Sequence, residues 1–241
     1  MAKKSRTPDP PKRPVQAPKV RSDPKRARDP RRTRIILAVI GAILLLALIG
    51  GGIAFAVGGG GGGGSKALES VCKVSTHKGQ GQKHITTDTL PKGFTYNSYP
   101  PTSGTHFQTP LIFGEYQQPV LQTHLVHNLE HGGVGVQYGA EVPDSTVQKL
   151  LAWYRVDPRG LVVAPLPADG QGAALNDKIA LTAWVADRDG DPTDPNTRVT
   201  KQTGTLAICS TFDEEAFNDF LDDYRGKGPE YFPLDSLAPG N

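Results

Sequence analysis

The chain has 241 residues, of which 37% are hydrophobic and 21% are charged, and its formal net charge is +3. This total combines opposite parts, since residues 1–34 have a net charge of +10 and the remaining residues have −7. The acidic part therefore lacks the charge expected of a nucleic-acid-binding domain. The length and the uneven distribution of glycine and proline favour one domain with appended segments.

The first 34 residues predict a disordered, basic, cytoplasmic tail. They contain seven prolines and no aromatic residue, so they bury too little apolar surface to offset the entropy of ordering the backbone. Beside a membrane, such a tail fixes the orientation of the chain and attracts anionic lipid. Without aromatic residues for base stacking, it does not indicate nucleic-acid binding.

Residues 35–57 form a stretch of 23 residues without a charge. As a helix this stretch would extend roughly 34 Å, which is enough to cross the bilayer core. Arg31, Arg32 and Arg34 lie directly before it, and the positive-inside rule places this side in the cytoplasm. The sequence thus predicts a single-pass transmembrane helix. The alternative is a cleaved signal peptide ending near Ala54–Ala56, although the apolar run is longer than such peptides usually have.

The segment 58–65 is a glycine linker with seven consecutive glycines, followed by an extracytoplasmic domain over 66–241. The only cysteines of the chain are Cys72 and Cys209. An isolated pair outside the cytoplasm favours a disulfide. The alternative is two unrelated cysteines, of which Cys209 is buried.

Periodicity and turn signals predict an α+β domain. Residues 66–123 are rich in glycine and proline and predict irregular structure. Helices are expected near 126–131, from 144 or 145 to 155, and over 213–225, whereas strands are expected over 134–138, 161–166, 179–185 and 205–210. This order fits helices packed on an antiparallel or mixed sheet, and a ferredoxin-like arrangement is the nearest named fold.

All six histidines lie between positions 77 and 131, and they are His77, His84, His106, His124, His127 and His131. On a helix, the last three would lie within roughly 60° of one another. The opposite face would present Leu125 and Leu129. One short amphipathic helix could therefore pack leucines inward and present several imidazoles together.

Residues 127–131 read His-Asn-Leu-Glu-His and match the H-x-x-E-H pattern of inverted zincins. A metal-dependent hydrolase of that kind needs a third ligand from another helix, for which Glu214 and Glu215 are the candidates. A second interpretation is a metal site without hydrolysis. A third is that the histidines stabilise an irregular region by hydrogen bonds to its backbone.

Two segments resemble the signatures of a bacterial family, the domain of unknown function 3105. They are residues 96–106 (YNSYPPTSGTH) and 126–134 (VHNLEHGGV), with further similarity at both cysteines and at 224–230 (YRGKGPE). The resemblance implies a membrane-anchored or secreted envelope protein, and it places His84, His106, His127, Glu130 and His131 within recurring motifs. Residues 186–204 look like an insertion, for which we predict a solvated surface hairpin.

We therefore expect a single-pass cell-membrane protein whose extracytoplasmic domain binds zinc or copper. The predicted ligands are His106, His127 and His131, with Glu130 as a fourth ligand or as a group that orients them. The chain has no methionine besides Met1, which argues against a thioether-based Cu(I) site. The alternatives are an envelope interaction or scaffold domain with an unidentified protein partner, and a metal-dependent hydrolase.

Overall fold

The computed structural model describes residues 65–166, 174–191, 194 and 196–240. The predicted cytoplasmic tail, the predicted transmembrane helix over 35–57 and all but the last residue of the glycine linker lie outside the described residues. Within the described ranges, no helix has the length and apolarity needed to cross a membrane.

The elements follow one another along the chain as five helices or helical turns and eight strands within the described residues. Their order is α2 (Lys66–Val71), β1 (Cys72–Lys78), β2 (His84–Ile85), β3 (His106–Phe107), β4 (Gly114–Glu115), α3 (Gln122–Glu130), β5 (Val134–Tyr138), α4 (Asp144–Tyr154), β6 (Leu161–Pro165), β7 (Ile179–Asp189), β8 (Arg198–Cys209), α5 (Glu214–Tyr224) and the 3-10 turn η1 (Leu234–Leu237).

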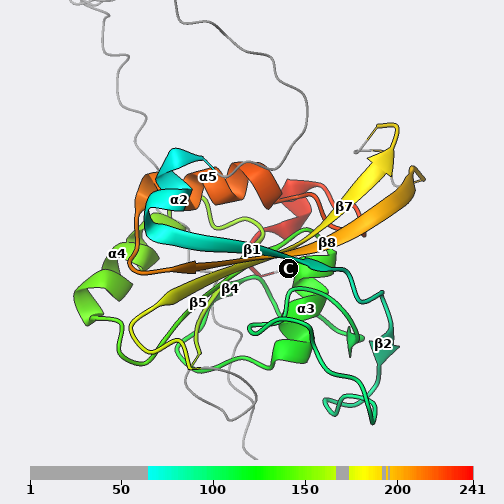
Figure 1. The fold of residues 1–241 in the computed structure, drawn as a ribbon, viewed down its shortest axis with the longest axis horizontal. Helices are drawn as coiled ribbons and strands as arrows, with labels where there is room; N and C mark the ends of the chain where they lie inside the picture. Colours follow the sequence, from blue (N-terminus) through cyan, green and yellow to red (C-terminus); the bar gives the residue numbers. More distant parts are fainter. Residues whose placement is uncertain (1–64, 167–173, 192–193, 195, 241) are drawn as a thin grey trace, which may run out of the picture. The chain divides into compact units, whose positions relative to one another are not determined.

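Six strands form a mixed sheet in the order β1-β8-β7-β5-β6-β4 (Figure 1). The pairs β1/β8, β8/β7 and β7/β5 are antiparallel, whereas β5/β6 and β6/β4 are parallel. The fold is thus α+β with a mixed sheet, as expected. It is not ferredoxin-like, because α4 connects two strands that are adjacent and parallel, whereas a ferredoxin-like crossover would skip a strand.

The sheet has two buried faces, and the alternation of side chains along its strands divides the core. Val134, Val136 and Leu181 pack in the larger cluster, together with residues of α2, α4 and α5. Val162 and Trp184 point the other way and pack in a cluster with leucines of α3. Figure 1 shows α2 and α5 on one side of the sheet and α3 on the other. The candidate site belongs to the α3 side.

Most predicted elements of 124–225 are confirmed. The last helix begins as expected after Asp213, whose side chain accepts a hydrogen bond from the backbone N–H of Ala216. Helix α3 is longer than predicted and begins at Gln122. In the region expected to be irregular, the structure contains α2 and the seven-residue strand β1.

The predicted disulfide between Cys72 and Cys209 is present. The two cysteines are register partners at one end of the β1/β8 pair. Strand β1 lies at the edge of the sheet. The disulfide therefore joins this edge strand covalently to β8, although the two cysteines are 137 residues apart in the sequence.

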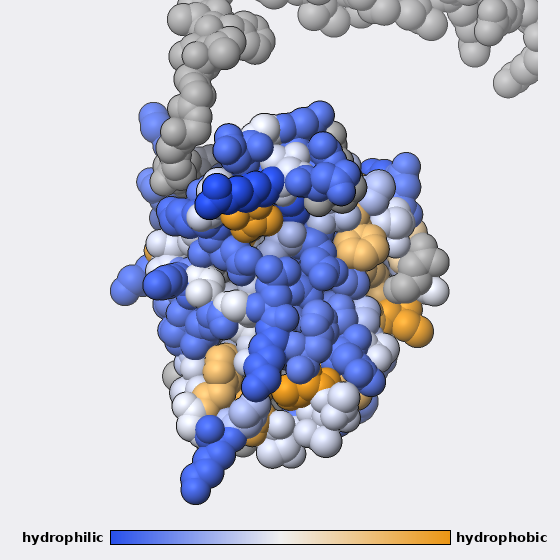
Figure 2. All heavy atoms as spheres, turned by 90° about the vertical axis from the view of Figure 1, so that its right-hand side faces the viewer, coloured by the Kyte–Doolittle hydropathy of each residue, from blue (hydrophilic) through white to orange (hydrophobic). Residues whose placement is uncertain are grey.

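The described residues of the segment 186–204 belong to the outer part of a long β7/β8 hairpin, as predicted, with an irregularity in register between Asp187 and Arg188. Figure 2 views the molecule from the side of β2 and the hairpin end, and hydrophilic residues cover most of this face. Hydrophobic residues appear there only in small separate patches. This face has the character of a surface in contact with water.

Candidate metal centre

Helix α3 is buried on both sides, which explains how its polar residues come to lie inside the domain. Leu125 and Leu129 are fully buried on the side of the sheet, as the amphipathic pattern predicts. Glu130 is also fully buried, and His127 is only 5% exposed. The cover on that side includes the segment 100–106, all of whose residues are buried.

The short parallel pair β2/β3 brings two further histidines together. His84 of β2 is the register partner of His106 of β3. Side chains of register partners point to the same face of a sheet, and the centroids of the two imidazole rings are accordingly 4.5 Å apart. The ring of His127 lies 4.9 Å from that of His84 and 4.8 Å from that of His106.

Three imidazoles and one carboxylate thus form a single group of His84, His106, His127 and Glu130. One ligand atom from each residue lies within 4.8 Å of every other. His106 and Glu130 are fully buried, whereas 40% of the His84 side chain is exposed. Three of the four residues are therefore buried, and the group reaches solvent through His84.

Backbone carbonyls fix the tautomers of the two buried histidines. His106 Nδ1 lies 2.7 Å from the carbonyl oxygen of Gly104, and His127 Nδ1 lies 2.7 Å from that of Phe107. Because a carbonyl oxygen only accepts hydrogen bonds, both Nδ1 atoms must donate. In the neutral rings the Nε2 lone pairs are consequently free, which is the arrangement of metal-binding histidines.

The free lone pairs face other acceptors. His106 Nε2 is 2.9 Å from Glu130 Oε2, and His84 Nε2 is 3.5 Å from the same oxygen. With the His106 proton on Nδ1, His106 Nε2 and Glu130 Oε2 are both acceptors, so neither satisfies the other in this buried position. The side chain of Gln82 is a further hydrogen-bonding neighbour of the Glu130 carboxylate. Buried polar atoms without partners are costly. A shared proton or a metal cation at this position would remove that cost.

His131 lies next to this group and begins a second one. Its Nε2 atom is 3.1 Å from His127 Nε2 and 3.3 Å from Glu230 Oε2. Together with Glu130, His131 and Glu230 form a set of three whose ligand atoms again lie within 4.8 Å of one another. Of the four predicted ligands, the structure therefore groups His106, His127 and Glu130 with His84 and places His131 at the boundary.

Burial and neighbouring charges change the pKa values in the cluster. Burial lowers the pKa of His127, and burial followed by repulsion from His127 lowers the pKa of His131 to about 4. For Glu130, burial raises the pKa, but the imidazoles of His106 and His84 contribute to a net lowering. At neutral pH the lowered pKa values favour neutral imidazoles at His127 and His131 and an ionised carboxylate at Glu130, the forms that bind metals.

The remaining candidate residues lie apart from the cluster. His124, on the same helix, contacts Asp88 at 2.8 Å and stacks on Phe107. His77 contacts Ser75 on β1. Glu214 and Glu215, the third-ligand candidates of the inverted-zincin interpretation, are exposed in the first turn of α5, and neither belongs to a metal-capable group within the described ranges.

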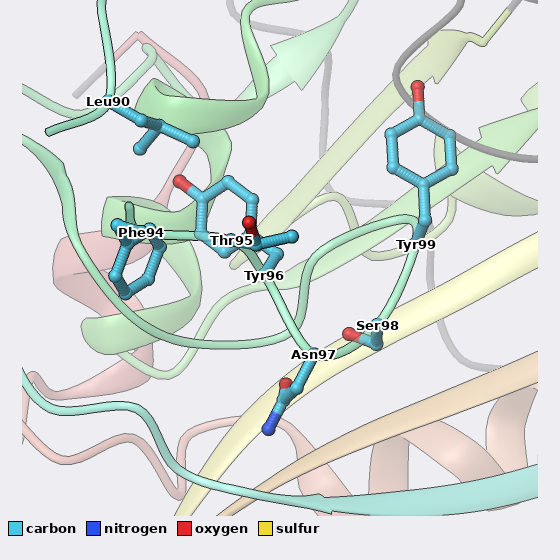
Figure 3. Close-up of a pocket in the computed structure, with 7 residues that line it drawn as sticks. All are labelled: Leu90, Phe94, Thr95, Tyr96, Asn97, Ser98 and Tyr99. Atoms are coloured by element: carbon cyan, nitrogen blue, oxygen red, sulfur yellow. The ribbon is translucent and has the colours of Figure 1, made fainter. Parts of the chain in front are cut away.

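A pocket of about 390 Å³ lies near the segment that leads to His106. Figure 3 shows Leu90, Phe94 and Tyr96 gathered on one side of it, with Tyr99 pointing away from them. The Tyr96 hydroxyl donates a hydrogen bond to the carbonyl oxygen of Thr105 at 2.7 Å. Tyr96 thus stabilises the backbone next to His106, but its pocket is separate from the imidazole cluster.

The sequence identifies most of this cluster through its motifs. His84 is one of the six histidines between positions 77 and 131, but only the family resemblance associates it with the other site residues, because no helical or sequential spacing relates it to His127. Glu230 was noted only as the last residue of the segment 224–230. The positions of His84 and Glu230 beside α3 depend on pairings between distant segments. In the sequence, only the family motifs indicate that these two residues belong to the site.

Fold and site together define an α+β domain with a buried histidine–glutamate cluster. The family described as "Protein of unknown function (DUF3105)" matches residues 88–233, which is more than half of the chain, and the protein belongs to that family. The match confirms the resemblance seen in the sequence. No curated protein and no solved structure matches the chain.

Proposed function

We propose that this protein binds a transition metal ion through His84, His106, His127 and Glu130, as an extracytoplasmic domain anchored to the cell membrane. The observation that carries the metal site is the contact between His106 Nε2 and Glu130 Oε2. The ring donates its only neutral-state N–H at Nδ1, so two acceptors face each other at 2.9 Å in a buried position. A cation bound to both atoms resolves this conflict.

The donor set favours zinc or copper(II). Three imidazole nitrogens and one carboxylate oxygen suit the borderline metals, whereas calcium and magnesium prefer sites made of oxygen alone. Zinc binds histidine nitrogens at roughly 2.0–2.1 Å, usually with four ligands. The four side chains of the group match that number, and the exposed edge of His84 provides a path for the ion to enter.

A metal-ligand role for Glu130 conflicts with the hydrolase interpretation of H-x-x-E-H. In that mechanism the glutamate stays free of the metal and acts as a general base. Here Glu130 Oε2 faces both His106 and His84. We therefore favour a binding role without hydrolysis. The alternative is a scaffold domain with structural histidines, which differs from a metal-binding domain in its response to added metal.

Membrane anchoring is supported by the uncharged stretch of 23 residues over 35–57 and the arginines before it. The disulfide between Cys72 and Cys209 supports an oxidising location for the domain, because disulfides are rare in the cytosol. The polar face of Figure 2 is compatible with a domain in contact with water.

The metal site is tested by thermal unfolding of the full chain in detergent, with and without added Zn²⁺ or Cu²⁺ after treatment with a chelator. At a metal concentration a hundredfold above Kd, the melting temperature should rise by roughly 5 °C or more. In His127→Ala this rise should be lost. His124→Ala is the matched control, because His124 lies on the same helix but contacts Asp88.

The scaffold alternative gives a different result. If the histidines are purely structural, His127→Ala lowers the melting temperature of the metal-free protein, and metal leaves the wild type unchanged. Absence of a metal-dependent rise in the wild type would therefore refute the proposed function. An equal loss of the rise in His124→Ala would refute the ligand assignment.

A further inference from the structure

The group formed by Glu130, His131 and Glu230 lies next to the first cluster and shares Glu130 with it. Its members come from the C-terminal end of α3 and from the loop that follows α5. This loop approaches α3 closely. The N–H of Gly226 donates to the carbonyl oxygen of Gly132 at 2.8 Å, and the N–H of Glu230 donates to that of Glu130 at 3.0 Å.

The close approach depends on glycine. A Cβ atom at Gly228 would lie 2.3 Å from both the carbonyl oxygen of Glu130 and the nitrogen of Gly132. Arg188 of β7 stabilises the same loop, because its guanidinium donates hydrogen bonds to the carbonyl oxygens of Gly228 and Pro229 at 3.2 and 2.6 Å. The carboxylate of Glu230 is therefore positioned by its backbone and by the hairpin.

The carboxylate of Glu130 has capacity for two cations. Its Oε2 atom faces His106 and His84, whereas Oε1 is buried and does not have the distance and geometry of a regular hydrogen bond to any described residue, with the side chain of Gln82 as a neighbour of this carboxylate. Each carboxylate oxygen can bind its own cation. Glu130 is the one residue that both groups share, so its carboxylate would bind a cation in each of them.

The contact between His127 and His131 lies at the boundary of the two groups. His127 Nε2 accepts, because its Nδ1 atom donates to the Phe107 carbonyl. His131 Nε2 is 3.1 Å from that atom and 3.3 Å from Glu230 Oε2. If His131 Nε2 carries a hydrogen, that one N–H faces two acceptors, His127 Nε2 and Glu230 Oε2. If it carries a lone pair instead, His131 can bind a cation together with the carboxylates of Glu130 and Glu230.

We propose that a second divalent cation binds at Glu130, His131 and Glu230, so that Glu130 bridges two metal ions. The inference rests on the proposed function, because Glu130 is a ligand of the first ion. One imidazole and two carboxylates form a harder donor set than three imidazoles and one carboxylate. The second site should therefore bind zinc more weakly than the first and accept manganese more readily.

The test is the metal content of the full chain in detergent. After chelation and equilibration with Zn²⁺, elemental analysis of the wild type should find two ions per chain, and calorimetric titration should show two steps. Glu230→Gln keeps the size of the side chain but removes its charge. This variant should retain the tight ion and lose the weaker step, with at least roughly a tenfold drop in affinity.

Glu214→Gln is the matched control, because Glu214 is an exposed glutamate outside both groups, and it should keep both ions. One ion in the wild type, or two unaltered steps in Glu230→Gln, would overturn the second site while leaving the proposed function intact. No ion at all in the wild type would overturn both proposals.

Discussion

At the scale of single residues, the position of Gly228 connects the packing of the domain with its candidate chemistry. The loop that contains it lies against the end of α3 at distances that exclude a side chain. The same loop continues directly into Glu230. A change at this glycine should therefore alter the stability of the fold and the geometry of the second group together.

For Gly228→Ala we expect the free energy of unfolding to fall by about 1–3 kcal/mol, because the new Cβ must displace the backbone of Glu130 or Gly132. Chemical denaturation of the full chain measures this loss. The control is Gly114→Ala in β4, where the nearest atom to the added Cβ would be 3.9 Å away. Similar losses in both variants would contradict the packing described here.

The sequence predicts the imidazoles that lie on one helix, because His127 and His131 are one turn apart and helical spacing is regular. It cannot predict from spacing that His84 joins them. That contact depends on a strand pair of two residues each, whose partners are 22 positions apart in the chain. No local pattern encodes such a pairing, which forms only when the loops around it are folded.

At the scale of elements, ion pairs join the segment after α4 to the end of α5. Asp157 contacts Arg159 at 2.7 Å and Arg225 at 3.1 Å. The hydrogen bond from Arg159 is the main cause that lowers the pKa of Asp157 to about 2. The folded state therefore holds this carboxylate in its ionised form.

The lowered pKa predicts how stability depends on pH. Asp157 stabilises the fold above its ordinary pKa of roughly 3.9, and this contribution should disappear as pH falls toward 2. Denaturation of wild type and Asp157→Asn should differ by less than about 1 kcal/mol at pH 7, because the side chain is 34% exposed. The difference should vanish near pH 2. A difference that grows on acidification would contradict the assignment.

Elements with strong periodicity were predicted well, and those that depend on distant partners were not. Helices α4 and α5 carry a regular apolar stripe, and the buried strands β5 and β6 are rich in branched residues. By contrast, β1 shows no clear alternation in burial. It is a strand because it pairs with β8 from the far end of the domain. The ferredoxin-like arrangement was wrong for the same reason. Hydrophobic periodicity predicts which residues form strands, but it does not predict the order of the strands in the sheet.

At the scale of the whole molecule, the predicted transmembrane helix determines on which side of the membrane each end of the chain lies. Protease added to cells with a permeable wall should remove the domain over 66–241 and leave an N-terminal tag intact, since the arginines before residue 35 should stay inside. Loss of the N-terminal tag with a protected domain would refute this orientation. A mature protein that begins near residue 57 would support the signal-peptide alternative instead.

The disulfide has a mechanical consequence for a domain attached through its N-terminus. A pull on the chain before Ser65 acts first on α2, which is only six residues long. It then reaches Cys72, the first residue of β1, and passes through the sulfur atoms to Cys209 at the end of β8. The hydrogen bonds between β1 and β8 are thereby bypassed, so tension loads an interior strand of the sheet and cannot peel the edge strand away.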